Sequence, residues 1–387
     1  MSRASVVVAA VAVLSAGPAL TGCSASPGPP PAPVSTAAPP TSAGPGLTPE
    51  SFGAVGDGST DDTAALQRAF DALTPGQTLE IAAGKVYRHS DVLTVRRPDV
   101  RISGGGTLLA TNEDRSEVLL DADDVVVDGP TFKMQATSRR GETFEQMKLR
   151  LADHSGIVVR DVTIDGSSAA GVYVGSGVSD FLLENLQVHD TRADGIHITG
   201  TAHDGTVRRP VVDRAGDDGV AVVSYREDGE PVRRVVVDSP TVRDNTNGRG
   251  VSVVGGEDIT YNDVHVTGSS SAAVYIASEG SPYYTFAPKR VKVVGATLEN
   301  SNTAASVDHG AFLVYSGNPG FAPEDISASD VTIRGTRAGA SSQVGVRADA
   351  SCTVGQVRLD AFTIEGGGKA FSANVPASSY TLSGWRV

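Results

Sequence analysis

Gly171-Val-Tyr-Val, Gly195-Ile-His-Ile, Gly219-Val-Ala-Val and Gly250-Val-Ser-Val share one pattern, in which a small residue precedes an apolar, a variable and an apolar residue. The pattern returns in four later segments: Ala273-Val-Tyr-Ile, Ala311-Phe-Leu-Val, Gly345-Val-Arg-Ala and Ala370-Phe-Ser-Ala. Successive starts lie 24, 24, 31, 23, 38, 34 and 25 residues apart. A short basal period lengthened by insertions is the signature of a solenoid.

Each repeat also holds two further short apolar runs. Ile157–Val159 and Val162–Ile164 precede Gly171 in this way. Three short strands per repeat imply three corners per turn, with successive turns stacked about 4.8 Å apart. The sequence therefore predicts an all-β fold, a single-stranded parallel β-helix over residues 49–387.

Composition and charge limit the alternatives. The chain has 387 residues with 44 Gly and 21 Pro, and ten of the prolines lie at or before Pro49. This abundance of helix breakers argues against a helical bundle. The formal net charge is −13, without a basic run or the Cys/His spacing of a zinc site, so we expect no nucleic-acid partner. The long Gly-rich body favours one core extended along an axis.

The N-terminus predicts export and a lipid anchor. Residues 1–22 carry one basic residue, Arg3, and an apolar stretch too short to span a bilayer, which is typical of a signal peptide. Leu20-Thr-Gly-Cys23 resembles a bacterial lipobox, which implies cleavage before Cys23 and lipidation of its thiol. Residues 23–48 are rich in Pro, Ser, Ala and Gly, so we expect a disordered tether. The protein is therefore expected on the outer face of the cell membrane, within the cell envelope, with the lipid anchor as its membrane contact.

The segment before the repeats predicts how the first end of the solenoid is covered. Residues 51–73 read Ser-Phe-Gly-Ala-Val-Gly-Asp-Gly-Ser-Thr-Asp-Asp-Thr-Ala-Ala-Leu-Gln-Arg-Ala-Phe-Asp-Ala-Leu, with Leu66, Phe70 and Leu73 on one helical face. Such a short helix suits the open end of a solenoid, whose unpaired strand edge would otherwise invite aggregation. The segment resembles the opening motif of the pectate-lyase-like proteins of the rhamnogalacturonase and epimerase-like group. The resemblance implies a right-handed parallel β-helix.

Charged residues gather at one corner of three central repeats. The residue before the small residue of the pattern is Asp194, Asp218 and Arg249 in these repeats, and Asp217 adjoins Asp218. Carboxylates within roughly 5–10 Å of one another cannot all ionise freely, so one should hold a proton while another stays charged. Glycoside hydrolysis needs this combination of one acid and one carboxylate. We further expect that Gly195, Gly219 and Gly250 leave room for a sugar to approach.

The same corner resembles the active site of glycoside hydrolase family 28, the polygalacturonases and rhamnogalacturonases. Arg192-Ala-Asp-Gly195, Gly216-Asp-Asp-Gly219 and Gly248-Arg-Gly250 stand where the family has Asn-Thr-Asp, Gly-Asp-Asp and Gly-His-Gly. The resemblance implies that Asp217 is the general acid, while Asp194 and Asp218 hold and deprotonate a water, with inversion. Tyr275-Ile-Ala277 replaces the family's Arg-Ile-Lys. Because that basic pair grips a substrate carboxylate, its loss favours a neutral or furanosidic polymer over polygalacturonate.

Other side chains are expected to contact a polysaccharide along this corner. Outward positions of the repeated strand carry aromatic and histidine rings, and an insertion at 277–289 adds further aromatic residues. Aromatic faces there could stack on sugar rings. The expected substrate contacts are Arg249, His197, Tyr173, Tyr275, Glu279, Tyr283 and Tyr284.

Two other functions compete with hydrolysis. In a polysaccharide lyase or epimerase, the three aspartates would hold Ca²⁺ and Arg249 would be the base. In a non-catalytic glycan-binding or adhesin solenoid, the aspartates would only bond nearby backbone N–H groups at the corners. For the hydrolase we expect no cofactor or metal, and a monomer. Because Cys23 is predicted to be lipidated, Cys352 is expected to form no intrachain disulfide.

Overall fold

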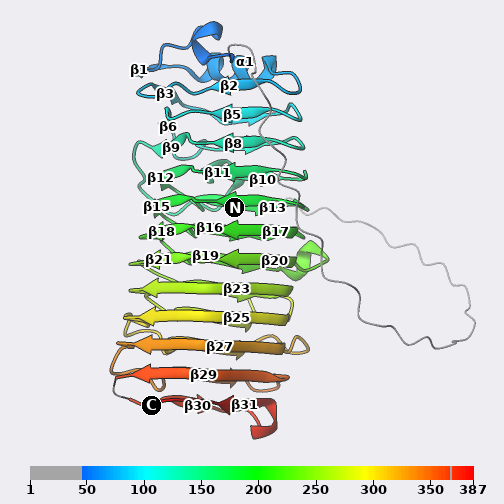
Figure 1. Ribbon diagram of the computed structural model, residues 1–387, viewed down its shortest axis with the longest axis vertical. Coiled ribbons are helices and arrows are strands. Elements are labelled where there is room, and N and C mark those ends of the chain that lie inside the picture. The colour runs from blue at the N-terminus through cyan, green and yellow to red at the C-terminus, as the bar shows by residue number, and fades with distance from the viewer. Residues whose placement is uncertain (1–45, 367) are drawn as a thin grey trace, which may run out of the picture. The chain divides into compact units, whose positions relative to one another are not determined.

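The computed structural model describes residues 46–366 and 368–387. The predicted signal peptide, Cys23 and most of the predicted tether lie outside these residues. The described residues form one compact unit, and within it short strands stack as successive rungs (Figure 1). Leu47 pairs with Leu79 in a parallel bridge, so the solenoid includes the last residues of the predicted tether.

One face of the solenoid is a sheet of eleven strands that pair in parallel and in register. Seven of these strands begin at the repeats predicted from Gly171 to Ala311 and at Ala370. The repeat predicted at Gly345 is wrong by two residues, because Gly345 pairs with Leu313 and Gln343 holds the equivalent position. The strands, in order, are β4 (Leu93–Val95), β7 (Val118–Leu120), β10 (Leu149–Ala152), β13 (Val172–Gly175), β16 (Ile196–Ile198), β19 (Val220–Val223), β22 (Val251–Val254), β24 (Val274–Ser278), β26 (Phe312–Ser316), β28 (Val344–Ala348) and β30 (Phe371–Ala373).

The other faces are two ladders that merge into one sheet of twenty strands. The first ladder holds β2 (Thr78–Glu80), β5 (Arg101–Ser103), β8 (Val126–Asp128), β11 (Val158–Arg160), β14 (Leu182–Glu184), β17 (His203–Arg208) and β20 (Arg233–Asp238). The second holds β1 (Asp57–Asp61), β3 (Val86–His89), β6 (Thr107–Ala110), β9 (Thr131–Met134), β12 (Thr163–Ser167), β15 (Gln187–Thr191), β18 (Val211–Asp213) and β21 (Thr241–Arg243). Both continue into β23 (Gly256–Thr267), β25 (Pro288–Glu299), β27 (Glu324–Arg334), β29 (Val357–Glu365) and β31 (Tyr380–Ser383). The predicted parallel β-helix with three strands per rung is therefore confirmed.

Both ends of the solenoid are covered. The helix α1 (Thr63–Ala72) lies at the first end (Figure 1) and buries Leu66 and Phe70, with Leu73 buried directly after it. At the other end Trp385 stacks on Phe362, with ring centroids 4.9 Å apart. Four short 3-10 helices complete the described elements: η1 (Pro49–Phe52), η2 (Phe144–Gln146), η3 (Arg226–Asp228) and η4 (Ala377–Ser379). None of the described helices is long and apolar enough to cross a membrane.

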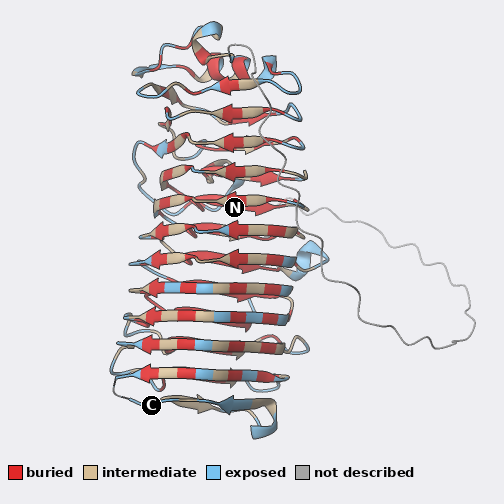
Figure 2. Cartoon of the chain, viewed as in Figure 1, coloured by how far each residue is buried: buried red, intermediate tan, exposed pale blue. Residues whose placement is uncertain are grey.

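At the corner between the first and second strand of a rung, one residue adopts the left-handed backbone conformation. Asp161 (φ 55°), Asn185 (φ 55°), Asp263 (φ 50°) and Asp330 (φ 58°) hold this position on different rungs. Asp and Asn tolerate this conformation better than most other residues. The side chains of this corner also join rungs, since Asn185 Nδ2 donates to Asp161 Oδ1 at 2.9 Å. Inside the corners, buried Val, Ile and Leu form a continuous core (Figure 2).

The glycines that open the strands of the eleven-stranded sheet serve packing. A Cβ on Gly219 would lie 2.5 Å from Val242 Cγ1 and 2.6 Å from the Gly250 carbonyl oxygen of the next rung. Val242 is buried in the core. Gly195 and Gly250 have equally close neighbours in the next rung. The expectation that these glycines make room for a sugar is therefore wrong, because the space they leave faces the core.

We expect Gly219→Ala to lower the free energy of unfolding by about 1–3 kcal/mol, because the added methyl group overpacks the core. Thermal unfolding followed by circular dichroism measures this. Gly105→Ala is the matched control, since its Cβ would have no neighbour closer than 3.6 Å. Equal melting temperatures for the two variants would contradict the packing role.

Candidate active site

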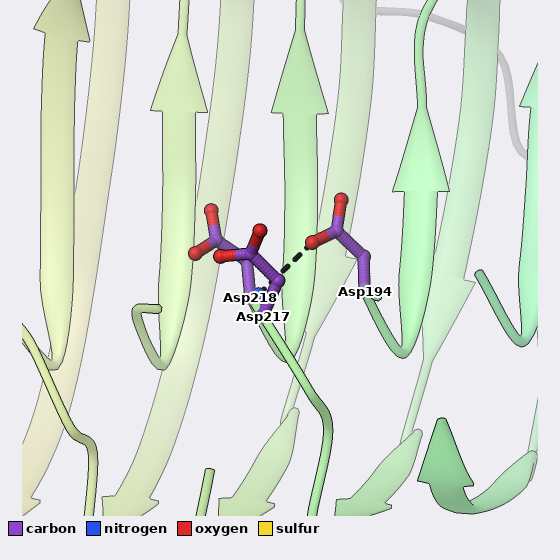
Figure 3. A group of neighbouring side chains, drawn as sticks. All are labelled: Asp194, Asp217 and Asp218. Carbon is purple, nitrogen blue, oxygen red and sulfur yellow. Dashed lines mark hydrogen bonds between the residues drawn. The ribbon is translucent and has the colours of Figure 1, made fainter. Parts of the chain in front are cut away.

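The three aspartates and Arg249 lie on neighbouring rungs, at the turns that lead into the eleven-stranded sheet. Asp194 precedes β16, Asp217 and Asp218 precede β19, and Arg249 precedes β22. These strands pair in register, so Asp194, Asp218 and Arg249 occupy equivalent positions on three successive rungs. The predicted common corner is confirmed, and Figure 3 shows the three carboxyl groups side by side.

The aspartates form a tight cluster. One carboxylate oxygen from each of Asp194, Asp217 and Asp218 lies within 4.8 Å of the others. Asp194 Oδ1 accepts the backbone N–H of Asp218 at 2.9 Å, and Asp218 Oδ1 accepts the backbone N–H of Arg249 at 2.8 Å. Asp194 and Asp218 thus tie each rung to the next, as corner residues do, and also belong to the cluster.

Asp194 is paired with a histidine. His197 Nδ1 lies 2.5 Å from Asp194 Oδ2, and the ring of Tyr173 stacks on the imidazole with centroids 5.4 Å apart. Burial by itself would raise the pKa of Asp194. The hydrogen bond and charge of His197, the backbone N–H of Asp218 and the charge of Arg249 outweigh burial and hold this pKa below its ordinary value. Asp194 is therefore an ionised carboxylate at neutral pH.

Arg249 lies between two carboxylates and can neutralise only one. Its Nε is 3.1 Å from Asp218 Oδ1, and its Nη2 is 3.6 Å from Glu279 Oε1. Asp218 is 3% exposed, and Ser252 donates a hydrogen bond to its Oδ2 at 2.5 Å. Burial first, and then the charges of Asp217 and Asp194, outweigh Arg249 and Ser252 and raise the pKa of Asp218 to about 7. Asp218 is thus the carboxyl group of the cluster that holds a proton near neutral pH.

The sequence did not predict the partner of Asp217. Arg140 donates to Asp217 Oδ2 at 2.7 Å from a loop between β9 and β10. The loop is fixed by other contacts, since Gly141 N donates to the Ser168 carbonyl at 2.5 Å and Arg192 Nη2 donates to the Thr137 carbonyl at 2.9 Å. A contact across 77 residues, made from a loop without a repeat pattern, leaves no local sequence signal.

A groove passes over the cluster. The central cavity, about 160 Å³, is lined by the three aspartates, Arg140, His197, Arg249 and Glu279, among others. A neighbouring cavity of about 590 Å³ extends over Phe144 and Tyr173, and another of about 360 Å³ extends toward Tyr315. Tyr283 lines all three cavities, so they adjoin one another, and together they are called the groove below. The acids lie at its central cavity, with a further cavity on either side.

Most of the predicted contact residues line the groove, but two do not. Tyr173, His197, Arg249, Glu279 and Tyr283 border at least one of the three cavities. Tyr275 points outward from β24 but is only 3% exposed, because the Arg249 guanidinium covers its ring at 4.6 Å. Tyr284 is exposed and borders none of these cavities. Burial corrects the prediction of direct contact for Tyr275, which supports Arg249, while the contact of the exposed Tyr284 stays a prediction.

The residues present fit a calcium ion poorly. Carboxylate oxygens suit Ca²⁺, which takes six to eight oxygen ligands. Five of the six oxygens of the cluster already have N–H, O–H or imidazole partners, the exception being Asp217 Oδ1. Arg140 and Arg249 also supply the positive charge that a cation would bring. The arrangement is therefore that of a carboxylate cluster balanced by guanidinium groups.

Comparison with known proteins gives partial matches in sequence. Residues 147–291 match the family model of the right-handed β-helix region. The chain is 28% identical over 191 residues to depolymerase 1, capsule K30/K69-specific, of Klebsiella phage K5-2. The match covers 44% of this chain and 23% of the depolymerase, so this chain spans less than a quarter of that relative's length.

Solved structures share the fold over most of the chain. The catalytic unit of the thermostable GH87 α-1,3-glucanase from Streptomyces thermodiastaticus strain HF3-3 has a TM-score of 0.67 at 18% identity, covering 90% of this chain and 70% of that chain. The A-module of the mannuronan C-5 epimerase AlgE6 of Azotobacter vinelandii has a TM-score of 0.64 at 18% identity, covering 88% and 98%. Together with the strand order, these matches show that the chain has the fold of the right-handed parallel β-helix proteins.

Proposed function

We propose that this chain is a carbohydrate-active enzyme that hydrolyses glycosidic bonds in a polysaccharide. The observation that carries the proposal is the cluster itself, in which one carboxylate oxygen each of Asp194, Asp217 and Asp218 lie within 4.8 Å of one another beside one cavity. Burial raises the pKa of Asp218 to about 7, which suits it to hold the proton. Such a group can protonate a leaving oxygen while a neighbouring carboxylate acts on water or carbon. The similarities to a capsule-specific depolymerase and to an α-1,3-glucanase support a polysaccharide substrate.

The proposal assigns the acid differently from the family resemblance. The resemblance implies Asp217 as the acid, but the Arg140 guanidinium already lies 2.7 Å from Asp217 Oδ2, whereas burial raises the pKa of Asp218 to about 7. We therefore assign the proton to Asp218, and the roles of carboxylates to Asp217 and Asp194. The implied inversion is part of the proposal, and the anomeric configuration of the first product tests it.

A lyase or epimerase using Arg249 as the base is less well supported. Burial would lower the pKa of Arg249, but the charges of Asp218 and Glu279 outweigh it and raise this pKa above its ordinary value. A guanidinium held charged in this way accepts no proton from a substrate carbon. The poor fit of the cluster to Ca²⁺ argues in the same direction.

Export and anchoring remain part of the proposal. The sequence of residues 1–48 supports cleavage before Cys23 and lipidation of its thiol. With the predicted tether, the groove would face polysaccharides of the cell envelope or of the surroundings.

Hydrolysis is tested with the purified chain on α-1,3-glucan, arabinan, galactan, polygalacturonate and mannuronan. We expect reducing ends to appear on at least one polymer, without ultraviolet absorbance from an unsaturated product and without inhibition by EDTA. NMR of the first product reports whether the anomeric configuration is retained or inverted. Asp218→Asn should lower kcat by about 10³-fold or more while polymer binding persists.

Asp165→Asn is the matched control, because this aspartate pairs with Lys133 outside the groove. An unsaturated product or loss of turnover with EDTA would replace hydrolysis by elimination. If the chain binds a polymer but forms no product, and Asp218→Asn binds it equally well, the adhesin alternative would replace hydrolysis.

The assignment of the acid is tested by the pH dependence of kcat/KM in Arg140→Gln. This substitution removes the guanidinium that lies 2.7 Å from Asp217 Oδ2. If Asp217 acts as a carboxylate, the acidic limb of the profile moves to higher pH and the alkaline limb stays. If Asp217 is the acid, the alkaline limb moves instead, which would contradict our assignment. Arg139→Gln, whose side chain pairs with Asp114, controls for the loop itself.

The proton on Asp218 also predicts a pH-dependent stability difference. Folding raises the pKa of Asp218 from about 3.8 to about 7. Burial of this group therefore lowers the free energy of unfolding little at pH 4 and increasingly between pH 4 and 7. Above pH 7 the loss is constant. Asp218→Asn avoids this cost. We expect its melting temperature to exceed that of the wild type by several degrees at pH 8, with the difference disappearing toward pH 4. A difference independent of pH would show that Asp218 has an ordinary pKa.

A further inference from the structure

A cavity of about 360 Å³ adjoins the catalytic cavity on the side of the later rungs. Glu279 and Tyr283 border both cavities, and Tyr315 and Asp349 border only this one among the three cavities of the groove. Tyr315 belongs to β26, which follows β19 by three rungs through β22 and β24. At about 4.8 Å per rung, the cavity lies about 14 Å along the solenoid from the acids. A polysaccharide that passes the acids along the groove therefore reaches it.

The charge of this cavity selects against anionic sugars. Glu279 and Asp349 are its ionisable acids, and in the described part of the chain none of its lining residues is cationic. Tyr315 donates its hydroxyl to Asp349 Oδ2 at 2.6 Å, which holds this carboxylate in place. Carboxylates accept hydrogen bonds from sugar hydroxyl groups and repel a uronate.

The walls of the cavity are preorganised. Glu279 N donates to Thr285 Oγ1 at 2.8 Å, and Asn318 Nδ2 donates to the Thr285 carbonyl at 2.7 Å. A Cβ on Gly280 would lie 2.4 Å from the Gly317 carbonyl oxygen, so the floor is closely packed backbone. On this fixed loop Tyr283 is 57% exposed, and its ring is free to stack on a sugar. Little ordering is therefore needed when a sugar binds.

We propose that this cavity is a binding subsite for an uncharged sugar residue of the substrate, with Asp349 and Glu279 accepting hydrogen bonds from its hydroxyl groups. The inference rests on the proposed function and deepens it. Because the groove also extends past the acids in the other direction, over Phe144 and Tyr173, the bound chain lies on both sides of the acids. The enzyme would then cleave within chains of a neutral polysaccharide.

Asp349→Ala and Tyr315→Phe test the subsite in two assays. The first is affinity electrophoresis in gels that contain the neutral polymers α-1,3-glucan (solubilised by carboxyl-free derivatisation), arabinan and galactan, or the anionic polymers polygalacturonate and mannuronan. The second is kcat/KM on short and long oligosaccharides of every polymer that is cleaved. We expect retardation by a neutral polymer, weakened about tenfold in Asp349→Ala and less in Tyr315→Phe. The loss in kcat/KM should appear with long oligosaccharides and be absent with the shortest ones.

Asp360→Ala is the matched control, because this aspartate also accepts a side-chain hydroxyl, that of Ser383, but lies on β29 in the other sheet. Retardation by anionic polymers alone, or by no polymer, would overturn the subsite, as would equal retardation of Asp349→Ala and wild type. Binding of a neutral polymer that depends on Asp349 but yields no product would sustain the subsite and refute the proposed hydrolysis.

Discussion

Parallel, in-register stacking at about 4.8 Å per rung is the constraint on which this structure depends. Because each strand pairs with the equivalent strand of the next rung, any residue type repeated in the sequence becomes a row in space. Apolar rows fill the core, and acidic rows bring like charges within a few ångströms of one another. The solenoid can therefore form a carboxylate cluster from three aspartates at matched positions, but it must also compensate their charge.

Elsewhere on the solenoid, acids and guanidinium groups compensate one another across rungs on the exposed surface. Arg214 pairs with Asp190, Arg234 with Asp204, and Arg290 with both Asp258 and Glu257. Such pairs contribute little to stability but prevent repulsion along the row. At the candidate site four carboxylates, Asp194, Asp217, Asp218 and Glu279, share two guanidinium groups and one imidazole. The charge of Asp218, the most buried of the three aspartates, is therefore incompletely compensated. A buried acid in this state is typical of reactive sites, and it distinguishes this corner from the structural corners.

Periodic features could be predicted from the sequence, and long-range features could not. The spacing of Gly171, Gly195 and Gly219 sets the rung, and the register then places Asp194 beside Asp218 without further information. Arg140 reaches Asp217 from a loop with no period, so no pattern in the sequence connects them. Tyr275 shows a second limit: alternation predicts that it points outward, but only the packing of Arg249 over its ring shows that it is covered. A third limit is Gly219, where only the packing of Val242 and Gly250 in the next rung shows that the space beside the glycine faces the core.

The irregular intervals between repeats nevertheless mark where the groove is built. The intervals of 31 and 38 residues contain the segments after β19 and β24, which pair through the antiparallel bridge between Tyr225 and Thr285. The interval of 34 residues contains Phe321, which packs on Phe286 and under the guanidinium of Arg226. Three insertions from different rungs thus support one another, and Tyr225, Glu279 and Tyr283 of the first two line the cavity of the aspartates. The loop that carries Arg140 lines the same cavity from an earlier part of the chain. The regular repeat brings the three aspartates together at the corner. The insertions that lengthen the repeat form walls of the groove and so determine which polymer can reach these acids.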